Sequence, residues 1–150
     1  MRVSILKVLG MLAILLIAGT LLMSRISRPA CTSLRGTDTL TVKLADLAPG
    51  KIRAFCYKDE AGRKLRFLLA RDSGGQVHAV FDACRQCYKF HKGYDYSHGY
   101  LICRVCGNRY PIGAVSTGEG SCVPVPLSHQ TSHGQVTIKV ADVKAGKWWF

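Results

Sequence analysis

The sequence predicts a mainly β protein: one small β-rich domain with two cysteine knuckles and long loops, preceded by a single N-terminal transmembrane helix. Three observations lead to this prediction. An uncharged apolar run lies near the N-terminus, short apolar segments separated by turn residues fill the remainder, and no later segment sustains a helical apolar period. We therefore divide the 150 residues into an anchor (1–27), a linker (28–40) and one domain (41–150).

The apolar run VLGMLAILLIAGTLLMS occupies residues 8–24. Extended to residues 5–23, it would form a helix of about 28 Å, which is close to the thickness of a bilayer core. A cleaved signal peptide is the alternative, but its apolar region should be shorter, and Arg28 stands where small residues should mark the cleavage site. We predict an uncleaved membrane anchor. Basic residues flank it on both sides, so the positive-inside rule does not orient it.

The formal net charge of +12 favours acidic partners or anionic lipid headgroups. Since no run of five or more Lys or Arg residues occurs, we predict no nucleic-acid partner. The chain also has no nucleophile–base pair, no glycine-rich phosphate loop and no H-E-x-x-H element. We therefore expect neither hydrolytic chemistry nor a small-molecule substrate.

One sequence pattern occurs near both ends of the predicted domain. Residues 41–51 read TVKLADLAPGK, and residues 137–147 read TIKVADVKAGK. Each copy predicts a short alternating strand, a turn at Ala-Asp and a Gly-Lys exit. The two strands could pair with each other, and we expect them to frame the core rather than to bind a ligand.

The segment between the two copies contains further strand signals. Residues 65–70 and 77–82 are separated by Arg-Asp-Ser-Gly-Gly, which predicts a hairpin. A second turn signal, Gly107-Asn108, separates the apolar residues 100–104 from 109–112. The two prolines near Cys122 are expected to interrupt any strand ladder there: Pro124 and Pro126.

Four of the seven cysteines follow the spacing C-x2-C-x15-C-x2-C: Cys84, Cys87, Cys103 and Cys106. Two residues between cysteines let both sulfurs of a tight turn reach one ion, and the second pair completes a tetrahedron. Disulfides are the alternative, but seven is an odd number, and C-x2-C pairs more often chelate or do redox work. Covalent haem is disfavoured because neither pair is followed directly by histidine.

The remaining possible ligands leave alternatives open. Cys122 lies in a glycine-rich loop and is either a fifth sulfur of the site or an ordinary buried or paired cysteine, with Cys31 and Cys56 as the candidate partners. His91 and His98 lie between the cysteine pairs, and each is either a nitrogen ligand or a free, solvated side chain. Five tyrosines of this region either enclose the site or pack a small core: Tyr88, Tyr94, Tyr96, Tyr100 and Tyr110.

Several short motifs together resemble one protein family, the FtrD-like membrane iron–sulfur-containing proteins of bacteria. The resemblance covers roughly residues 40–150, and Tyr88, Ser121 and Val123 depart from the family pattern. It rests on these motifs: Phe81-Asp82-Ala83-Cys84, Cys87, Gly93-Tyr94, Ile102-Cys103, Cys106-Gly107 and Gly120-x-Cys122-x-Pro124.

This resemblance implies a role in bacterial iron uptake, beside a high-affinity iron permease and a polyferredoxin-like membrane protein. It further implies electron transfer on the outer, periplasmic or extracellular, face of the cytoplasmic membrane. The implied metal-region cysteines are Cys84, Cys87, Cys103, Cys106 and Cys122.

Three functions follow as hypotheses. The leading one is a membrane-anchored electron carrier, rather than an enzyme, with an iron or iron–sulfur centre. The second is a structural zinc module that docks partners, and the third is a metal-delivery protein in which Cys122 and a histidine form a labile second site. The residues alone do not separate zinc from iron, since both accept four thiolates.

Overall fold

The computed structural model describes residues 9–13, 15, 30–115 and 122–150 of the chain. Most of the predicted anchor, residues 1–27, and the glycine-rich residues before Cys122 lie outside this part. Among the described residues, no helix is both long enough and apolar enough to cross a bilayer.

The domain is built from three sheets, as the prediction of a mainly β fold requires. The largest has five strands in the spatial order β1-β3-β4-β5-β9: Thr32–Leu34, Lys51–Lys58, Lys64–Arg71, Val77–Cys84 and Pro124–Pro126. The second has the order β10-β11-β2: Gln130–Ser132, Gln135–Lys139 and Thr39–Lys43. The third has the order β6-β7-β8: Tyr94–Ser97, Tyr100–Cys103 and Arg109–Pro111.

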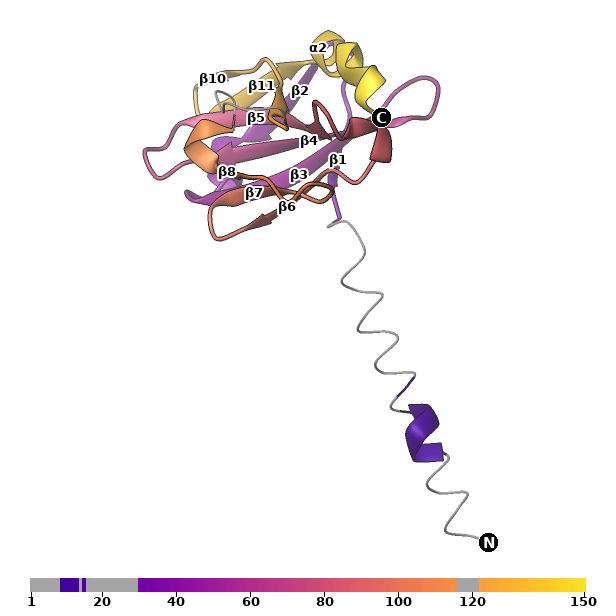
Figure 1. Ribbon diagram of the computed structural model, residues 1–150. Coiled ribbons are helices and arrows are strands. Elements are labelled where there is room, and N and C mark those ends of the chain that lie inside the picture. The colour runs from indigo at the N-terminus through magenta and orange to yellow at the C-terminus, as the bar shows by residue number, and fades with distance from the viewer. Residues whose placement is uncertain (1–8, 14, 16–29, 116–121) are drawn as a thin grey trace, which may run out of the picture.

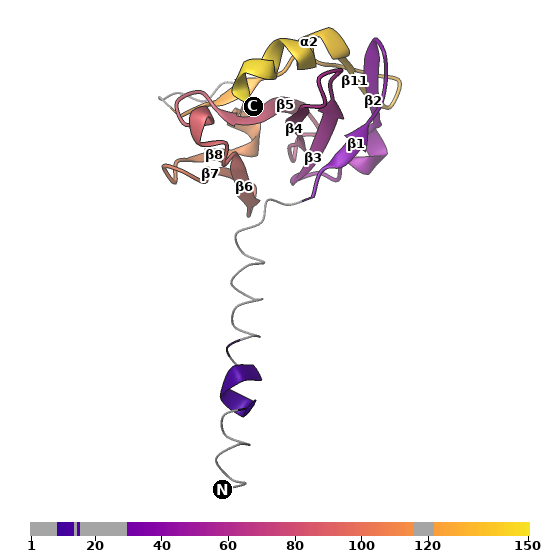
Figure 2. The same cartoon turned by 90° about the vertical axis from the view of Figure 1, so that its right-hand side faces the viewer.

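Helical segments within the described residues of the domain, 30–115 and 122–150, are short. One α-helix, α2 (Val140–Ala145), follows β11 and continues into the 3-10 helix η4 (Gly146–Trp149). The described residues contain three further 3-10 helices: η1 (Leu44–Asp46), η2 (Tyr88–Phe90) and η3 (Ile112–Ala114). Figures 1 and 2 show the sheet of β2 and β11 with α2 on one side of the five-stranded sheet, and β6, β7 and β8 on the other.

The five-stranded sheet is therefore the middle layer, and its side chains divide between two cores. Alternation along β4 sends Phe67 to one face and Leu68 to the other, because successive strand residues point in opposite directions. All eight residues of β5 are buried, as expected for a strand covered on both faces. Burial of an aromatic or aliphatic side chain of this kind contributes about 1.5–3 kcal/mol.

Both expected hairpins are present. β4 and β5 pair antiparallel from Arg71↔Val77, and Asp72 closes the turn by accepting the Gln76 amide proton on its Oδ1 atom at 2.9 Å. The Asp72 Oδ2 atom lies 2.9 Å from Nε2 of the buried His78, so that this histidine has a structural role. β7 and β8 also pair antiparallel, around the predicted turn.

The two repeated segments pair with each other, which confirms that possibility. β2 and β11 are antiparallel, and the equivalent residues Thr41 and Thr137 lie directly opposite one another. A local two-fold axis therefore passes between these two threonines. Leu40, Val42, Val136 and Ile138 point into the core from the two strands, so the repeat frames the core as expected.

The segment predicted to be a linker, residues 28–40, contains β1 and the first residues of β2. β1 runs parallel to β3, with Thr32 opposite Phe55. A disulfide joins Cys31 to Cys56, whose Cα atoms are 5.8 Å apart. This pairing settles one open alternative, since Cys122 is free and neither Cys31 nor Cys56 bonds to it.

The expectation that prolines interrupt the ladder near Cys122 was wrong. Pro124 and Pro126 both belong to β9, which pairs with β5. The prolines are tolerated because β9 is the edge strand of its sheet. On the open side of an edge strand, no neighbour needs the N–H group that proline lacks. The register shifts between the two paired positions, Val80↔Pro126 and Cys84↔Pro124.

Candidate metal centre

The first cysteine of each pair ends a strand. Cys84 is the last residue of β5, and Cys103 is the last residue of β7. The chain turns after each of them, and the second turn is closed by the Gly107 amide, which donates to the Cys103 carbonyl at 2.9 Å. Gly107 has φ +75°, the left-handed conformation that glycine adopts without strain.

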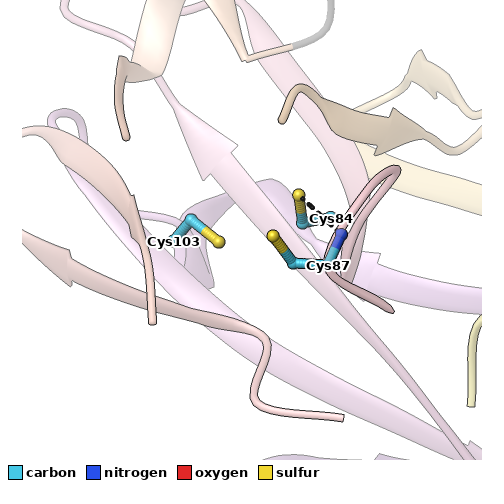
Figure 3. Close-up of side chains that lie close together, drawn as sticks. All are labelled: Cys84, Cys87 and Cys103. Atoms are coloured by element: carbon cyan, nitrogen blue, oxygen red, sulfur yellow. Dashed lines mark hydrogen bonds between the residues drawn. The ribbon is translucent and has the colours of Figure 1, made fainter. Parts of the chain in front are cut away.

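The cysteine sulfurs converge from these strand ends. The Sγ atoms of Cys84, Cys87 and Cys103 all lie within 4.8 Å of one another, and Figure 3 shows the three side chains turned toward a common space. A second group with the same limit contains Cys87, Cys106 and Cys122. Cys87 belongs to both groups, so the structure brings five sulfurs together rather than four.

Cys122 reaches the site through the edge strand that follows it. β9 pairs with β5 beside Cys84, and the amide of Arg85 donates to the Val123 carbonyl at 3.2 Å. The Cys122 carbonyl accepts a hydrogen bond of 3.1 Å from the Tyr94 hydroxyl. These contacts place the Cys122 sulfur 3.6 Å from that of Cys87. Thiolates arranged tetrahedrally at about 2.3 Å from one ion are separated by about 3.8 Å, which is close to this distance.

Backbone amides favour the thiolate form of one cysteine in each knuckle. Burial acts to raise the pKa of Cys84, but hydrogen bonds led by the Cys87 amide, whose nitrogen is 3.4 Å from the sulfur, hold this pKa below its usual value. The pKa of Cys106 is also lowered against burial, chiefly by the Asn108 amide. Burial and neighbouring thiols raise the pKa of Cys87 and of Cys122. Full ionisation of the cluster therefore depends on a bound cation.

A buried ion pair that the sequence analysis missed supports the loop between the knuckles. Arg66 and Asp82 are both buried, and the Arg66 Nε atom donates to the Asp82 Oδ2 atom at 2.6 Å. The other carboxylate oxygen accepts the Tyr94 amide proton at 2.8 Å. A Cβ atom on Gly93 would lie 2.5 Å from this oxygen, so only glycine fits there. The sequence does carry a signal for this ion pair, since each of the apolar runs LRFLLA and VHAVFDAC contains one charged residue.

Three of the five tyrosines pack with the cysteines, and two do not. Tyr94 and Tyr110 are buried in the core that contains the cysteines, and Tyr96 packs against it. Burial raises the pKa of Tyr94 far above its usual value, so its hydroxyl keeps its proton and can donate to Cys122. Tyr88 and Tyr100 are exposed instead.

The two histidines between the cysteine pairs lie outside both sulfur groups. His91 is exposed and ends η2 with φ 50°. His98, also at φ 50°, forms with Gly99 the two-residue turn between β6 and β7, where both central residues need positive φ. The tripeptide Ser-His-Gly recurs at residues 132–134 in the turn between β10 and β11, with the same backbone signs. His98 is thus explained by its turn.

The donor set indicates which ions the site suits. Within the described residues, both groups of possible ligands consist of cysteine alone. Soft thiolates suit iron, iron–sulfur clusters and zinc, whereas calcium, magnesium and manganese prefer oxygen. The residues present therefore fit an iron or iron–sulfur centre, and they leave zinc chemically possible.

Comparison with known proteins bears on whether the cysteine site suits iron or zinc. The family model described as "Membrane iron-sulfur containing protein FtrD-like" matches residues 47–150. No curated protein sequence matches the chain. Neither the family description nor the cysteine cluster favours zinc over iron.

Two solved structures illustrate the more distant likenesses. A chain of the oxygenase–ferredoxin complex of carbazole 1,9a-dioxygenase is 18% identical, with a TM-score of 0.40 over 63% of this chain and 93% of that one. The quaternary ammonium Rieske monooxygenase CntA is 13% identical, with a TM-score of 0.44 over 75% of this chain and 32% of that one. At such scores, neither likeness assigns a fold or a function.

Proposed function

Because this chain belongs to the FtrD-like family of membrane iron–sulfur-containing proteins, we propose that its cysteine cluster holds an iron or iron–sulfur centre and that the protein transfers electrons. The observation that carries this proposal is the convergence of five cysteine sulfurs in two groups that share Cys87. When bound, such a centre supplies a one-electron redox couple.

The cysteines would have different tasks at this centre. Cys84 and Cys103 are buried at strand ends and keep water away from the side that faces the core. Cys106 is exposed, so it offers the shortest route between the centre and a redox partner. Cys87 and Cys122 lie between these two positions, and Cys122 is either a ligand or a thiol held beside one.

Metal and spectral analysis of the full chain, purified without oxygen, tests this proposal. We expect iron in stoichiometric amount and a visible absorption band that bleaches on reduction with dithionite. Acid-labile sulfide distinguishes a cluster from a single iron ion. A colourless protein that carries stoichiometric zinc and takes up no electron would contradict the proposal.

The disulfide supports an outer location for the domain. Disulfides persist in oxidising compartments and are rare in the cytosol. Cys31 lies shortly after the predicted anchor, residues 1–27, and its bond to Cys56 attaches this part of the chain to β3. We therefore propose a single-pass protein of the cytoplasmic membrane whose domain faces the periplasm or the exterior.

A reporter fusion tests this topology. A phosphatase that needs disulfides to fold, fused after Phe150, should be active, and the same fusion starting at residue 28 should be inactive. Activity that does not depend on residues 1–27 contradicts anchoring by this segment. An inactive full-length fusion contradicts the outer location.

The proposed cellular role is electron transfer during iron transport. Its partners would be an iron permease and a polyferredoxin-like membrane protein, as the family resemblance implies. Cross-linking in intact membranes, followed by purification of the tagged full chain, should recover both partners. Iron uptake that is unchanged in cells lacking this chain would contradict the role.

A further inference from the structure

Exposed apolar side chains gather beside the cysteine pairs. In the described residues of the domain, five large apolar side chains are exposed, and three of them adjoin the knuckles. Tyr88 follows Cys87 directly, Phe90 lies two residues further on, and Val105 lies between Cys103 and Cys106. Phe90 is 55% exposed. Such exposure is unusual in this domain, because the phenylalanines of its sheets are all buried.

The same segments carry positive charge and no carboxylate. Residues 84–92 and 103–109 together contain five cationic side chains and no Asp or Glu: Arg85, Lys89, Lys92, Arg104 and Arg109. The two acids nearest in the sequence are both paired, Asp82 with Arg66 and Asp95 with Arg104. Arg85, Lys89 and Lys92 are exposed, and the Lys89 Nζ atom lies 5.9 Å from the centre of the Phe90 ring.

These side chains surround one site because the sulfurs bring the two knuckles together. The Cys87 and Cys106 sulfurs lie within 4.8 Å of each other, so the residues that follow Cys87 and precede Cys106 flank the same cluster. The Tyr88 ring is further held against Trp149 of η4, with ring centres 5.1 Å apart. We call this surface the knuckle rim and define it by six residues: Arg85, Tyr88, Lys89, Phe90, Lys92 and Val105.

We propose that the knuckle rim is the docking surface for an acidic redox protein. This inference rests on the proposed electron transfer, because the rim adjoins Cys87 and Cys106, and Cys106 is the exposed cysteine of the site. Apolar groups at the centre of an interface exclude water, and surrounding charges steer the partner and set its orientation. A membrane surface also attracts lysines and aromatic rings, but it exchanges no electrons, and a rim pressed on lipid would be closed to a partner.

The electron step at this interface is simple. With a centre held by these cysteines, one electron would pass from the reduced partner to the site beside Cys106. The partner would be oxidised by one electron and the centre reduced by one, with no bond made or broken. Charge complementarity therefore affects the rate through encounter, and the rate should fall as salt screens the rim.

The test uses the full chain with its centre, held in neutral phosphatidylcholine nanodiscs. A reduced acidic ferredoxin serves as the probe, and stopped-flow absorbance gives the second-order rate at low and high salt. The double variant Lys89→Glu and Lys92→Glu should lower the low-salt rate by about tenfold or more. The matched control carries Lys43→Glu and Lys139→Glu, two exposed lysines on β2 and β11 across the central sheet, and should stay within about twofold of the unaltered chain.

The apolar part of the rim is tested by binding. Phe90→Ser should raise the dissociation constant of the oxidised ferredoxin at both salt concentrations, since salt does not screen an apolar contact. Trp148→Ser, at a ring that is 74% exposed outside the rim, is the control and should leave this constant unchanged. Hydrogen exchange at residues 85–92 and 104–107 should slow when ferredoxin is added.

Equal rates for the two charge variants would overturn the proposal. So would slowed exchange at the rim that requires phosphatidylglycerol in the nanodisc and not ferredoxin, because the rim then faces lipid. Dithionite separates this failure from failure of the proposed function. If dithionite still bleaches the centre in every variant, the centre is redox-active and only the docking surface is wrong; if it bleaches none, the electron-transfer function is wrong.

Discussion

The two faces of the central sheet differ in the interactions that stabilise the elements packed on them. The face toward β2, β11 and α2 has a core of eighteen buried residues, all of them aliphatic or aromatic. The face toward β6, β7 and β8 has ten, of which three are cysteines. We call these the aliphatic half and the cysteine half. The core of the first is made entirely of apolar side chains, whereas the second combines short strands, a buried ion pair and a sulfur site that a metal would complete.

The largest effect is expected where the two sulfur groups meet. Cys87→Ser removes the sulfur that both groups share, so we expect loss of nearly all bound iron. Hydrogen exchange should then accelerate in β6, β7 and β8 while β3, β4 and β11 stay protected. The double variant Cys31→Ser and Cys56→Ser is the control, since it removes two sulfurs outside the cluster and should retain iron. Equal acceleration in both halves would contradict the comparison.

A substitution in the aliphatic half should act on the whole domain. Phe67→Ala deletes a fully buried ring of β4 and should lower the free energy of unfolding by about 3–5 kcal/mol. Iron should be released in the same transition as the loss of far-ultraviolet circular dichroism, because both halves share the central sheet. Iron release well before this transition would show that the cysteine half opens by itself.

The buried ion pair should matter more than the exposed one in the same half. Asp82→Asn removes the carboxylate charge that pairs with the buried Arg66 guanidinium, and we expect the free energy of unfolding to fall by about 3 kcal/mol in chemical denaturation. Asp95→Asn, which removes the exposed partner of Arg104, is the matched control and should cost less than about 1 kcal/mol. A similar cost for the two variants would mean that the pair of Arg66 and Asp82 adds no special support.

The smallest expected effect compares two glycines with positive φ, one from each half. Gly107 has φ +75°, Gly134 has φ +72°, and a Cβ atom at either would meet open space. Alanine at either position should therefore cost about 1 kcal/mol of backbone strain. Only Gly107→Ala should also weaken iron retention against a chelator, because Gly107 closes the second knuckle. If Gly134→Ala weakens retention equally, the effect is one of general stability.

Much of the aliphatic half follows from local pattern. The hairpin of β4 and β5 was predicted from alternation and from a turn of Asp, Ser and Gly, which are signals within a dozen residues. The pairing of β2 with β11 was anticipated because the two segments repeat one pattern. The disulfide between Cys31 and Cys56 was not, since cysteine spacing alone does not specify a pairing.

The candidate site was predicted in part. Its four paired cysteines were recognisable because each pair forms its own turn, and the spacing of such turns has a chemical meaning. The assembly of Arg66, Asp82 and Tyr94 depends on which strands lie side by side, and no local pattern carries that information. The proline expectation at β9 was wrong for the same reason, because an edge position is a property of the whole sheet.

By itself, then, the sequence determined the β-rich class, the hairpins and the two cysteine pairs of the candidate site, since all of these depend on neighbouring residues. Only the tertiary structure decided that five sulfurs meet rather than four and that Cys87 is common to both groups. It also decided that a buried pair of Arg66 and Asp82 supports the cysteine half. These features join residues that are distant in the chain, and only the packing of the sheets brings them together.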